Sequence, residues 1–392
     1  MKVRLTRRPF TTFASRTFFR PSREGFRALM WLALIFVGAL AMNACRRRAY
    51  LPQPYVAFVA NNQSHTVAAV DLANFRVVTS IPVAPNPEQV SVRPGSLELY
   101  VVSASGSLSV ISIPERRVTA TLRLGRAARA LVFTADGRQA FVLEPAAGQI
   151  VFLDTTPLKE RARIRLGAEL SSLALSPDQK TLVAACAPQN RLFIISVESR
   201  QALGEIEVGR GAGPLAILPY GSKVFVADTA EQKITAADLN SRQVLSHIEI
   251  GSKPSALILK PDGGEIFVLS REAARLTIVD AFHDNVEQIL PTGRGPAAGL
   301  LRGDASVLYL ATADDGTVTT FDITNRVVRA STHTGVAPCA LALTPDERFL
   351  VVADSATSSL AVLRTDRSAL VTTIPVGSKP VDVVVPDWLG KR

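Results

Sequence analysis

The stretch VVADSATSSLAVLRTDRSALVTTIPVGSKP, residues 351–380, decides the fold, because it is one copy of a unit that recurs along the chain. In it, an apolar run, a short polar connection and a second apolar run lead to the sequence Gly-x-x-Pro. Residues 224–254, VFVADTAEQKITAADLNSRQVLSHIEIGSKP, follow the same order. Glycine permits a sharp bend at such a point, and proline fits where no backbone donor is needed. The two copies indicate a repeat of short strands with turn residues at fixed places.

The spacing of this unit is nearly constant over the whole body of the chain. In residues 351–380 the second apolar run, SLAVLR, ends at Arg364. The copies of this run along the chain end at Asp71, Ser112, Asp154, Ser196, Asp238, Asp280, Asp322 and Arg364. The first spacing is 41 residues and the other six are 42 residues. Each unit holds four short β-branched or alternating runs, and Pro-Asp or Asp-Gly turns follow the first of them in several copies. Four strands at a period of about 40–45 residues predict an all-β chain folded as a β-propeller of eight blades.

The two ends of the repeat region predict how the ring closes. Residues 55–60, 66–71 and 76–83 supply strands two to four of a unit, whereas residues 381–385 supply a lone first strand. Together they would complete one blade, so that no sheet edge is left open to aggregation.

These residues resemble the YVTN-repeat β-propellers, whose unit runs roughly Y-V-x-N/D, V-x-V-I-D, I-x-V-G-x-x-P and a P-D-G turn. The resemblance covers about residues 55–386 and is specific for the fold because it recurs eight times. Many members of that family are assigned seven blades, so seven is the alternative count. The family includes surface-layer and cell-envelope proteins, and related propellers are enzymes. The resemblance therefore implies the architecture but no single function.

The charge of the chain is concentrated at its N-terminus. The sequence has 44 Lys and Arg against 34 Asp and Glu, with a formal net charge of +10. Residues 1–48 contain 11 of the basic residues and one acidic residue, Glu24, which leaves 33 of each sign in the rest. A neutral body lacks the basic surface that nucleic-acid binding requires, so we expect no nucleic-acid partner.

The N-terminal segment is typical of an export signal. A basic region precedes the uncharged run ALMWLALIFVGALAM, residues 28–42, and Ala44-Cys45 follows shortly after it. This ending resembles a bacterial lipobox, which implies that Cys45 is lipidated. An uncleaved membrane anchor and simple secretion are the alternatives. We therefore divide the chain into a leader (1–45), a linker (46–54), a propeller (55–386) and a C-terminal tail (387–392).

One candidate binding surface lies in the loops that follow the fourth strand of each unit. Five of the eight loops place a cation at nearly the same register: Arg126, Arg210, Lys253, Arg294 and Lys379. In a closed ring these cations would form a partial basic crown that attracts a carboxylate, a phosphate or an acidic glycan. The alternative is that the loop tips are simply charged and solvated.

A second candidate lies where the first strand begins. Most copies place a small residue there, but two copies have Gln89 and Asp382, which the closed ring puts on adjacent blades. They would line the channel as a binding spot, or else hydrogen-bond to each other at the closure.

The sequence contains no zinc-protease, covalent-haem or nucleophile-elbow motif, and its four His fall at different registers of the repeat. We expect no metal and no cofactor. The resulting prediction is an exported, lipid-anchored propeller, periplasmic or on the cell surface, which binds or scaffolds an envelope protein or an acidic glycan. The alternative is a propeller enzyme, either lactonase-like or resembling the haem-binding nitrite reductases.

Overall fold

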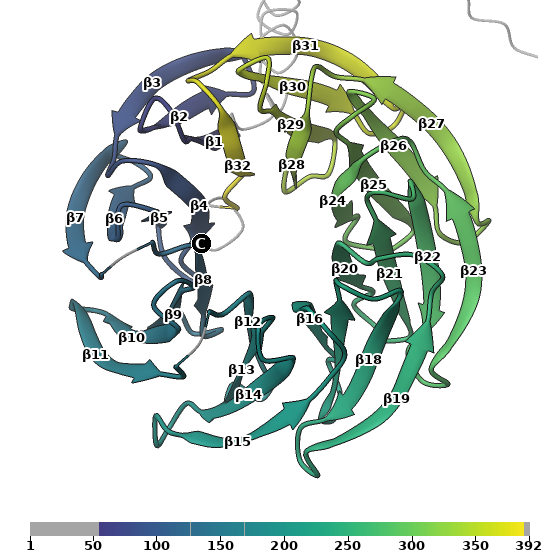
Figure 1. Cartoon of the computed structure of the whole chain (residues 1–392). Coiled ribbons are helices and arrows are strands. Elements are labelled where there is room, and N and C mark those ends of the chain that lie inside the picture. Colours follow the sequence, from purple (N-terminus) through teal and green to yellow (C-terminus); the bar gives the residue numbers. More distant parts are fainter. Residues whose placement is uncertain (1–54, 126, 168, 388–392) are drawn as a thin grey trace, which may run out of the picture. The chain divides into compact units, whose positions relative to one another are not determined.

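A computed structural model describes residues 55–125, 127–167 and 169–387. These residues form 32 β-strands in eight four-stranded antiparallel sheets, which are arranged as blades around a central channel (Figure 1). The predicted all-β propeller and its count of eight blades are confirmed. The leader, the linker and Cys45 lie outside the described residues. Within the described part, no helix is long and apolar enough to cross a membrane.

Each blade runs from an inner strand at the channel to an outer strand at the rim (Figure 1). Blades 1 to 4 consist of β4 (Pro87–Val92), β5 (Glu98–Ser103), β6 (Ser107–Ser112), β7 (Arg117–Arg123); β8 (Ala130–Phe133), β9 (Gln139–Glu144), β10 (Gln149–Thr155), β11 (Leu158–Arg165); β12 (Ser172–Leu175), β13 (Thr181–Cys186), β14 (Arg191–Ser196), β15 (Ala202–Glu207); and β16 (Ala212–Ile217), β17 (Lys223–Asp228), β18 (Lys233–Asp238), β19 (Gln243–Glu249). Blades 5 to 7 consist of β20 (Ala256–Leu259), β21 (Glu265–Ser270), β22 (Arg275–Asp280), β23 (Asn285–Pro291); β24 (Pro296–Leu301), β25 (Val307–Thr312), β26 (Thr317–Asp322), β27 (Val327–His333); and β28 (Pro338–Leu343), β29 (Phe349–Asp354), β30 (Ser359–Arg364), β31 (Ala369–Pro375).

Blade 8 joins the two ends of the repeat region, as predicted. Its inner strand is β32 (Pro380–Val384), and its other strands are β1 (Val56–Asn61), β2 (Thr66–Asp71) and β3 (Arg76–Pro82). Val59 of β1 lies opposite Val383 of β32, and Ala60 lies opposite Asp382. Backbone hydrogen bonds across this pair close the ring, so no blade is left with an unpaired second strand.

The core lies between neighbouring blades, because strands two and three are buried on both faces. β29, for example, is buried at five of its six residues, while the outer strand β7 alternates between exposed and half-buried residues. Between blades 6 and 7 the core includes Val307, Tyr309 and Leu363. Burial of an aliphatic side chain such as Val307 or Leu363 contributes about 1.5–3 kcal/mol. The repeated interfaces make the ring a rigid frame for its loops.

Turn chemistry follows the aspartates that end the third strands. Oδ1 of Asp71 accepts the backbone N–H of Ala73 at 2.8 Å, and Oδ1 of Asp280 accepts that of Phe282 at the same distance. The recurrence of this residue thus reflects a local turn that each copy needs.

Candidate functional site

The loops between each outer strand and the next inner strand carry the predicted cations. Arg210, Lys253, Arg294 and Lys379 are all exposed on these loops, while Arg126 lies outside the described residues. Their registers differ by one residue, because the two arginines directly follow the loop glycine and the two lysines come one position later.

Two of these cations are already paired by the same geometry. Arg210 Nε donates to Oε1 of Glu231 at 3.0 Å, and its backbone N–H donates to Oε2 at 3.2 Å. Arg294 Nε and its backbone N–H donate to the two oxygens of Asp315 at 2.7 and 2.6 Å. Lys233 and Arg210 lower the pKa of Glu231 to about 2. These carboxylates lie in the next blade, so the two arginines tie blades together and balance their own charge.

The two lysines are different. Neither Lys253 nor Lys379 forms an ion pair with a described residue. The backbone of Lys379 is nonetheless held, since its carbonyl accepts the N–H of Asn62 at 2.8 Å. Among the four described cations, only these two carry a charge without a partner. They belong to blades three positions apart, so they do not make a continuous ring.

Gln89 and Asp382 lie at equivalent positions of adjacent inner strands, yet they do not bond to each other. Asp382 Oδ2 accepts the backbone N–H of Val90 at 2.9 Å. Gln89 Oε1 accepts the N–H of Leu131 at 2.7 Å, and its Nε2 donates to the Leu131 carbonyl at 3.3 Å. In each case the side chain reaches the next blade and satisfies the free backbone edge of its inner strand. Asp382 therefore joins blade 8 to blade 1, and Gln89 joins blade 1 to blade 2, through their inner strands.

Burial shifts the pKa of Asp382. It raises the pKa of the carboxyl to about 6, although Val90 and Val383 donate their N–H groups to it. Cys339 lies near it and donates through Sγ to the Pro380 carbonyl at 3.4 Å. Burial and the nearby Asp354 and Asp382 raise the pKa of this thiol to about 11. The thiol is therefore unreactive as a nucleophile at neutral pH.

A ring of buried side chains was missed by the sequence reasoning. These residues end the second strand of each blade and are completely shielded from solvent: Asn61, Ser103, Glu144, Cys186, Asp228, Ser270, Thr312 and Asp354. The signal was present, because the Y-V-x-N/D part of the repeat marks this position. Burial raises the pKa of Asp228 and of Asp354 to about 6 and raises that of Glu144 as well.

The three buried carboxylates are each held inside their own region. Thr235 Oγ1 donates to Asp228 Oδ2 at 2.7 Å, and Thr334 Oγ1 donates to Asp354 Oδ1 at 2.9 Å. Glu144 accepts from Gln149 and from Arg163 Nη1. Among the described residues, no three His, Cys, Asp or Glu side chains lie close enough together to hold a metal ion.

The glycine of Gly-x-x-P lies directly over these buried side chains. A Cβ on Gly335 would lie 2.8 Å from Cγ of Asp354, and one on Gly209 would overlap the carboxyl of Asp228. Gly251 is an exception, because a Cβ there would meet no heavy atom within 4 Å. The glycine thus permits close approach of the loop to a bulky acid, in addition to the bend that the sequence suggested.

No protein-family model matches the sequence, and no curated protein matches it. Solved structures do resemble the fold. Dihydro-haem d1 dehydrogenase NirN, in complex with DHE, has a TM-score of 0.73 at 14% identity over 84% of this chain and 74% of that one. Apo AztD from Citrobacter koseri has a TM-score of 0.67 at 13% identity, covering 85% and 98%. A functionally unknown protein from Desulfotomaculum acetoxidans has a TM-score of 0.61 at 16% identity, covering 74% and 99%. At such identities the likeness is one of fold, and the chain is an eight-bladed β-propeller.

Proposed function

We propose that this chain is an exported YVTN-type propeller that is held at a membrane by a lipid on Cys45 and binds a partner at the cell envelope. The observation that carries the proposal is the division of the sequence into two parts. A basic and apolar leader ends at Cys45, and an electrically neutral repeat region follows it. A leader of that kind directs a chain out of the cytoplasm, and lipid on a cysteine would keep it at the membrane.

A binding role is supported by how the ring uses its polar groups. The inner-strand side chains Gln89 and Asp382 bond within the fold, and each of the three buried carboxylates bonds there through one of its two oxygens. The loops differ from blade to blade, and two of them present unpaired lysines, Lys253 and Lys379. A rigid frame with variable loops favours display of a surface to an envelope protein or an acidic glycan.

The lipid anchor is tested by replacing Cys45 with Ser. We expect the full chain to incorporate labelled fatty acid and to fractionate with membranes, and Cys45→Ser to lose both properties. Cys339→Ser is the matched control, because its thiol lies in the ring and the hydroxyl would keep the donor. Continued fatty-acid incorporation into Cys45→Ser would overturn the lipid anchor. Membrane retention without incorporation would instead support an uncleaved apolar anchor.

A second candidate is a propeller enzyme, lactonase-like or haem-binding and nitrite-reductase-like. One observation favours its haem-binding form, namely the fold likeness to NirN, a dihydro-haem d1 dehydrogenase. An absorbance spectrum of the protein purified from its native host tests it directly. A Soret band would support the enzyme and oppose a purely scaffolding role.

A further inference from the structure

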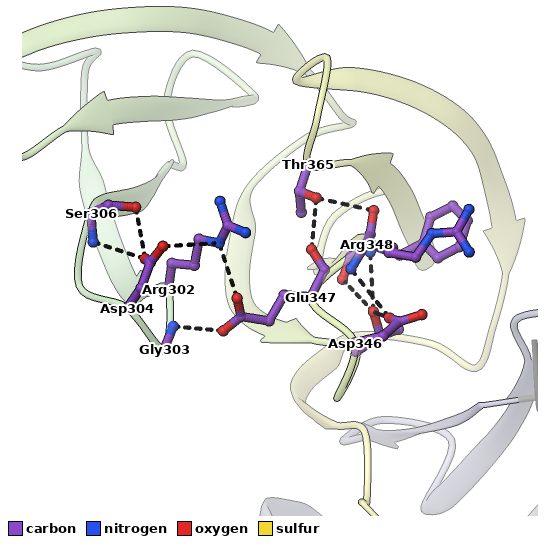
Figure 2. A network of polar contacts seen from close by, with 10 residues as sticks. Arg302, Gly303, Asp304, Ser306, Asp346, Glu347, Arg348 and Thr365 are labelled. Carbon is purple, nitrogen blue, oxygen red and sulfur yellow. Dashed lines mark hydrogen bonds and ion pairs between the residues drawn. The ribbon is translucent and has the colours of Figure 1, made fainter.

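A polar cavity of about 350 Å³ lies between blades 6 and 7. Its lining includes none of the loop cations Arg210, Lys253, Arg294 and Lys379. Its lining includes three arginines, Arg302, Arg329 and Arg367, the hydroxyl-bearing Tyr309 and Thr320, and one acid, Asp366. Two of its lining residues are labelled in Figure 2, Arg302, which follows β24, and Thr365, which follows β30.

Tyr309 and Thr320 are cross-strand partners, directly opposite each other on β25 and β26. They are only 3% and 5% exposed, and neither hydroxyl bonds to a described residue. Thr320 is the one polar residue at its register, where the described copies otherwise have Ala69, Val110, Phe152, Ile194, Ala236, Ile278 and Val362. Neither hydroxyl is among the fully buried polar atoms of the described residues, so both open onto the cavity, where they can bond to a group that occupies it.

Blade 1 contains the same arginine and tyrosine at equivalent positions, but there the pair is used by the fold. Tyr100 Oη donates to the Thr155 carbonyl at 3.4 Å. Arg93 donates to the Gly137 carbonyl at 2.9 Å, to Glu98 at 2.8 Å and to Thr156 at 2.7 Å. In blade 1 the arginine and the tyrosine therefore both form hydrogen bonds across the interface with blade 2.

In blade 6 the equivalent arginine is Arg302, and it is held through its Nε atom only. Arg302 Nε donates to Oε2 of Glu347 at 3.0 Å, while the other oxygen of Glu347 accepts the N–H of Gly303 at 2.6 Å. Figure 2 shows the two terminal nitrogens of Arg302 turned away from Glu347, and no described residue accepts a hydrogen bond from them. The fold therefore positions this guanidinium but leaves its terminal donors open.

Two further arginines of the cavity wall also have donor groups without a partner among the described residues. Arg329 Nε donates to Oδ2 of Asp322 at 2.8 Å, whereas its Nη1 has no partner in the described part of the chain. Arg367 is exposed and forms no ion pair with a described residue. Asp366, the one acid of the lining, accepts Nε of Arg364 at 3.0 Å. Open donors thus outnumber open acceptors on the cavity wall.

We infer that this cavity binds a small oxyanion, a carboxylate or a phosphate group. Terminal guanidinium nitrogens of Arg302 bind two of its oxygens, and the hydroxyls of Tyr309 and Thr320 donate to it. A volume of about 350 Å³ holds such a group together with a sugar-sized body. The inference deepens the proposed function by naming where an anionic ligand binds, and it rests on that function only for the ligand's presence at the envelope.

The test is calorimetric titration of the full chain in detergent with inorganic phosphate, with sodium glucuronate and with neutral glucose. The informative variant is the double substitution Tyr309→Phe and Thr320→Val, which introduces residues that other blades carry at the same registers. Tyr100→Phe is the matched control, because its hydroxyl already bonds within the fold. Far-ultraviolet circular dichroism verifies that every variant is folded.

We expect saturable binding of at least one oxyanion, at least about tenfold weaker in the double variant and unchanged in Tyr100→Phe. Tenfold corresponds to about 1.4 kcal/mol. The tighter of the two probes identifies a phosphate or a carboxylate ligand. Absence of saturable binding, stronger binding of glucose, or equal affinity of the double variant would each overturn the site. None of these results depends on Cys45, so failure of the anchor and failure of this site remain distinguishable.

Discussion

The backbone N–H of Val90 donates a 2.9 Å hydrogen bond to Oδ2 of Asp382, although 292 positions separate the two residues in the chain. Asp382 belongs to the last strand of the ring and Val90 to the first complete blade. The next junction repeats the arrangement, because Gln89 binds the backbone of Leu131. Side chains of the inner strands thus join the closing blade to blade 1, and blade 1 to blade 2.

Replacement of Asp382 with Ala should loosen this closure. The backbone N–H of Val90 would lose its acceptor at a buried position, which costs about 1–3 kcal/mol in free energy of unfolding. Urea denaturation followed by circular dichroism measures the effect. Asp382→Asn is the control, because the amide oxygen can still accept that hydrogen bond. An Ala variant as stable as the wild type would show that the β1–β32 pairing alone closes the ring.

The buried carboxylates predict that part of the stability falls as pH rises. Burial raises the pKa of Asp228 from an ordinary 3.8 to about 6, so the folded chain keeps this proton after the unfolded chain has lost it. The free energy of unfolding should therefore decrease between about pH 4 and pH 6, by at most about 3 kcal/mol for one such group. In a pH series of urea denaturations, Asp228→Asn should remove the share of this decrease that comes from Asp228 and leave the shares of Asp354 and Asp382.

Asp136→Asn provides a control of opposite sign. Hydrogen bonds from Thr134 and from the backbone N–H of Arg138 lower the pKa of Asp136, so its ionised form stabilises the fold above about pH 4. Its replacement should reduce stability at neutral pH and leave the decrease between pH 4 and pH 6 in place. If Asp228→Asn retained the full decrease, the buried carboxylate would not be its source.

The glycine above Asp228 should tolerate no side chain. A Cβ on Gly209 would overlap the carboxyl group, and such overpacking costs about 1–3 kcal/mol. Gly209→Ala should therefore lower the midpoint of urea unfolding. In an Asp228→Ser background, which copies the residue found at position 270, the same substitution should cost much less. If Gly209→Ala lowered the stability equally in the two backgrounds, the carboxyl group of Asp228 would not be the reason why this position requires glycine.

Binding of an acidic polysaccharide should depend on the unpaired lysines of the loops. Lys253→Glu combined with Lys379→Glu should weaken binding severalfold and reduce its dependence on salt concentration. The control is Arg210→Gln combined with Arg294→Gln, whose guanidinium groups are already paired with Glu231 and Asp315. Surface-plasmon resonance at several salt concentrations distinguishes the two. Equal losses in both double variants would indicate a general effect of charge.

The number of blades, the order of the strands and the closure of the ring could all be predicted from the amino-acid sequence. A 42-residue period in apolar and turn residues is a local property, so it can be read from one chain. The turn at Asp71 is equally local, because its carboxylate bonds to backbone N–H groups only two and three residues away.

The roles of the polar residues became clear from the three-dimensional structure, because their partners come from neighbouring blades. Arg210 and Lys253 have similar places in the repeat, yet Glu231 of the next blade pairs with the first and no described acid pairs with the second. Tyr100 and Tyr309 likewise occupy one register, and a carbonyl in the adjoining blade accepts from the first alone. Whether a partner lies within hydrogen-bonding distance depends on how two blades pack, and the repeat pattern describes each blade separately.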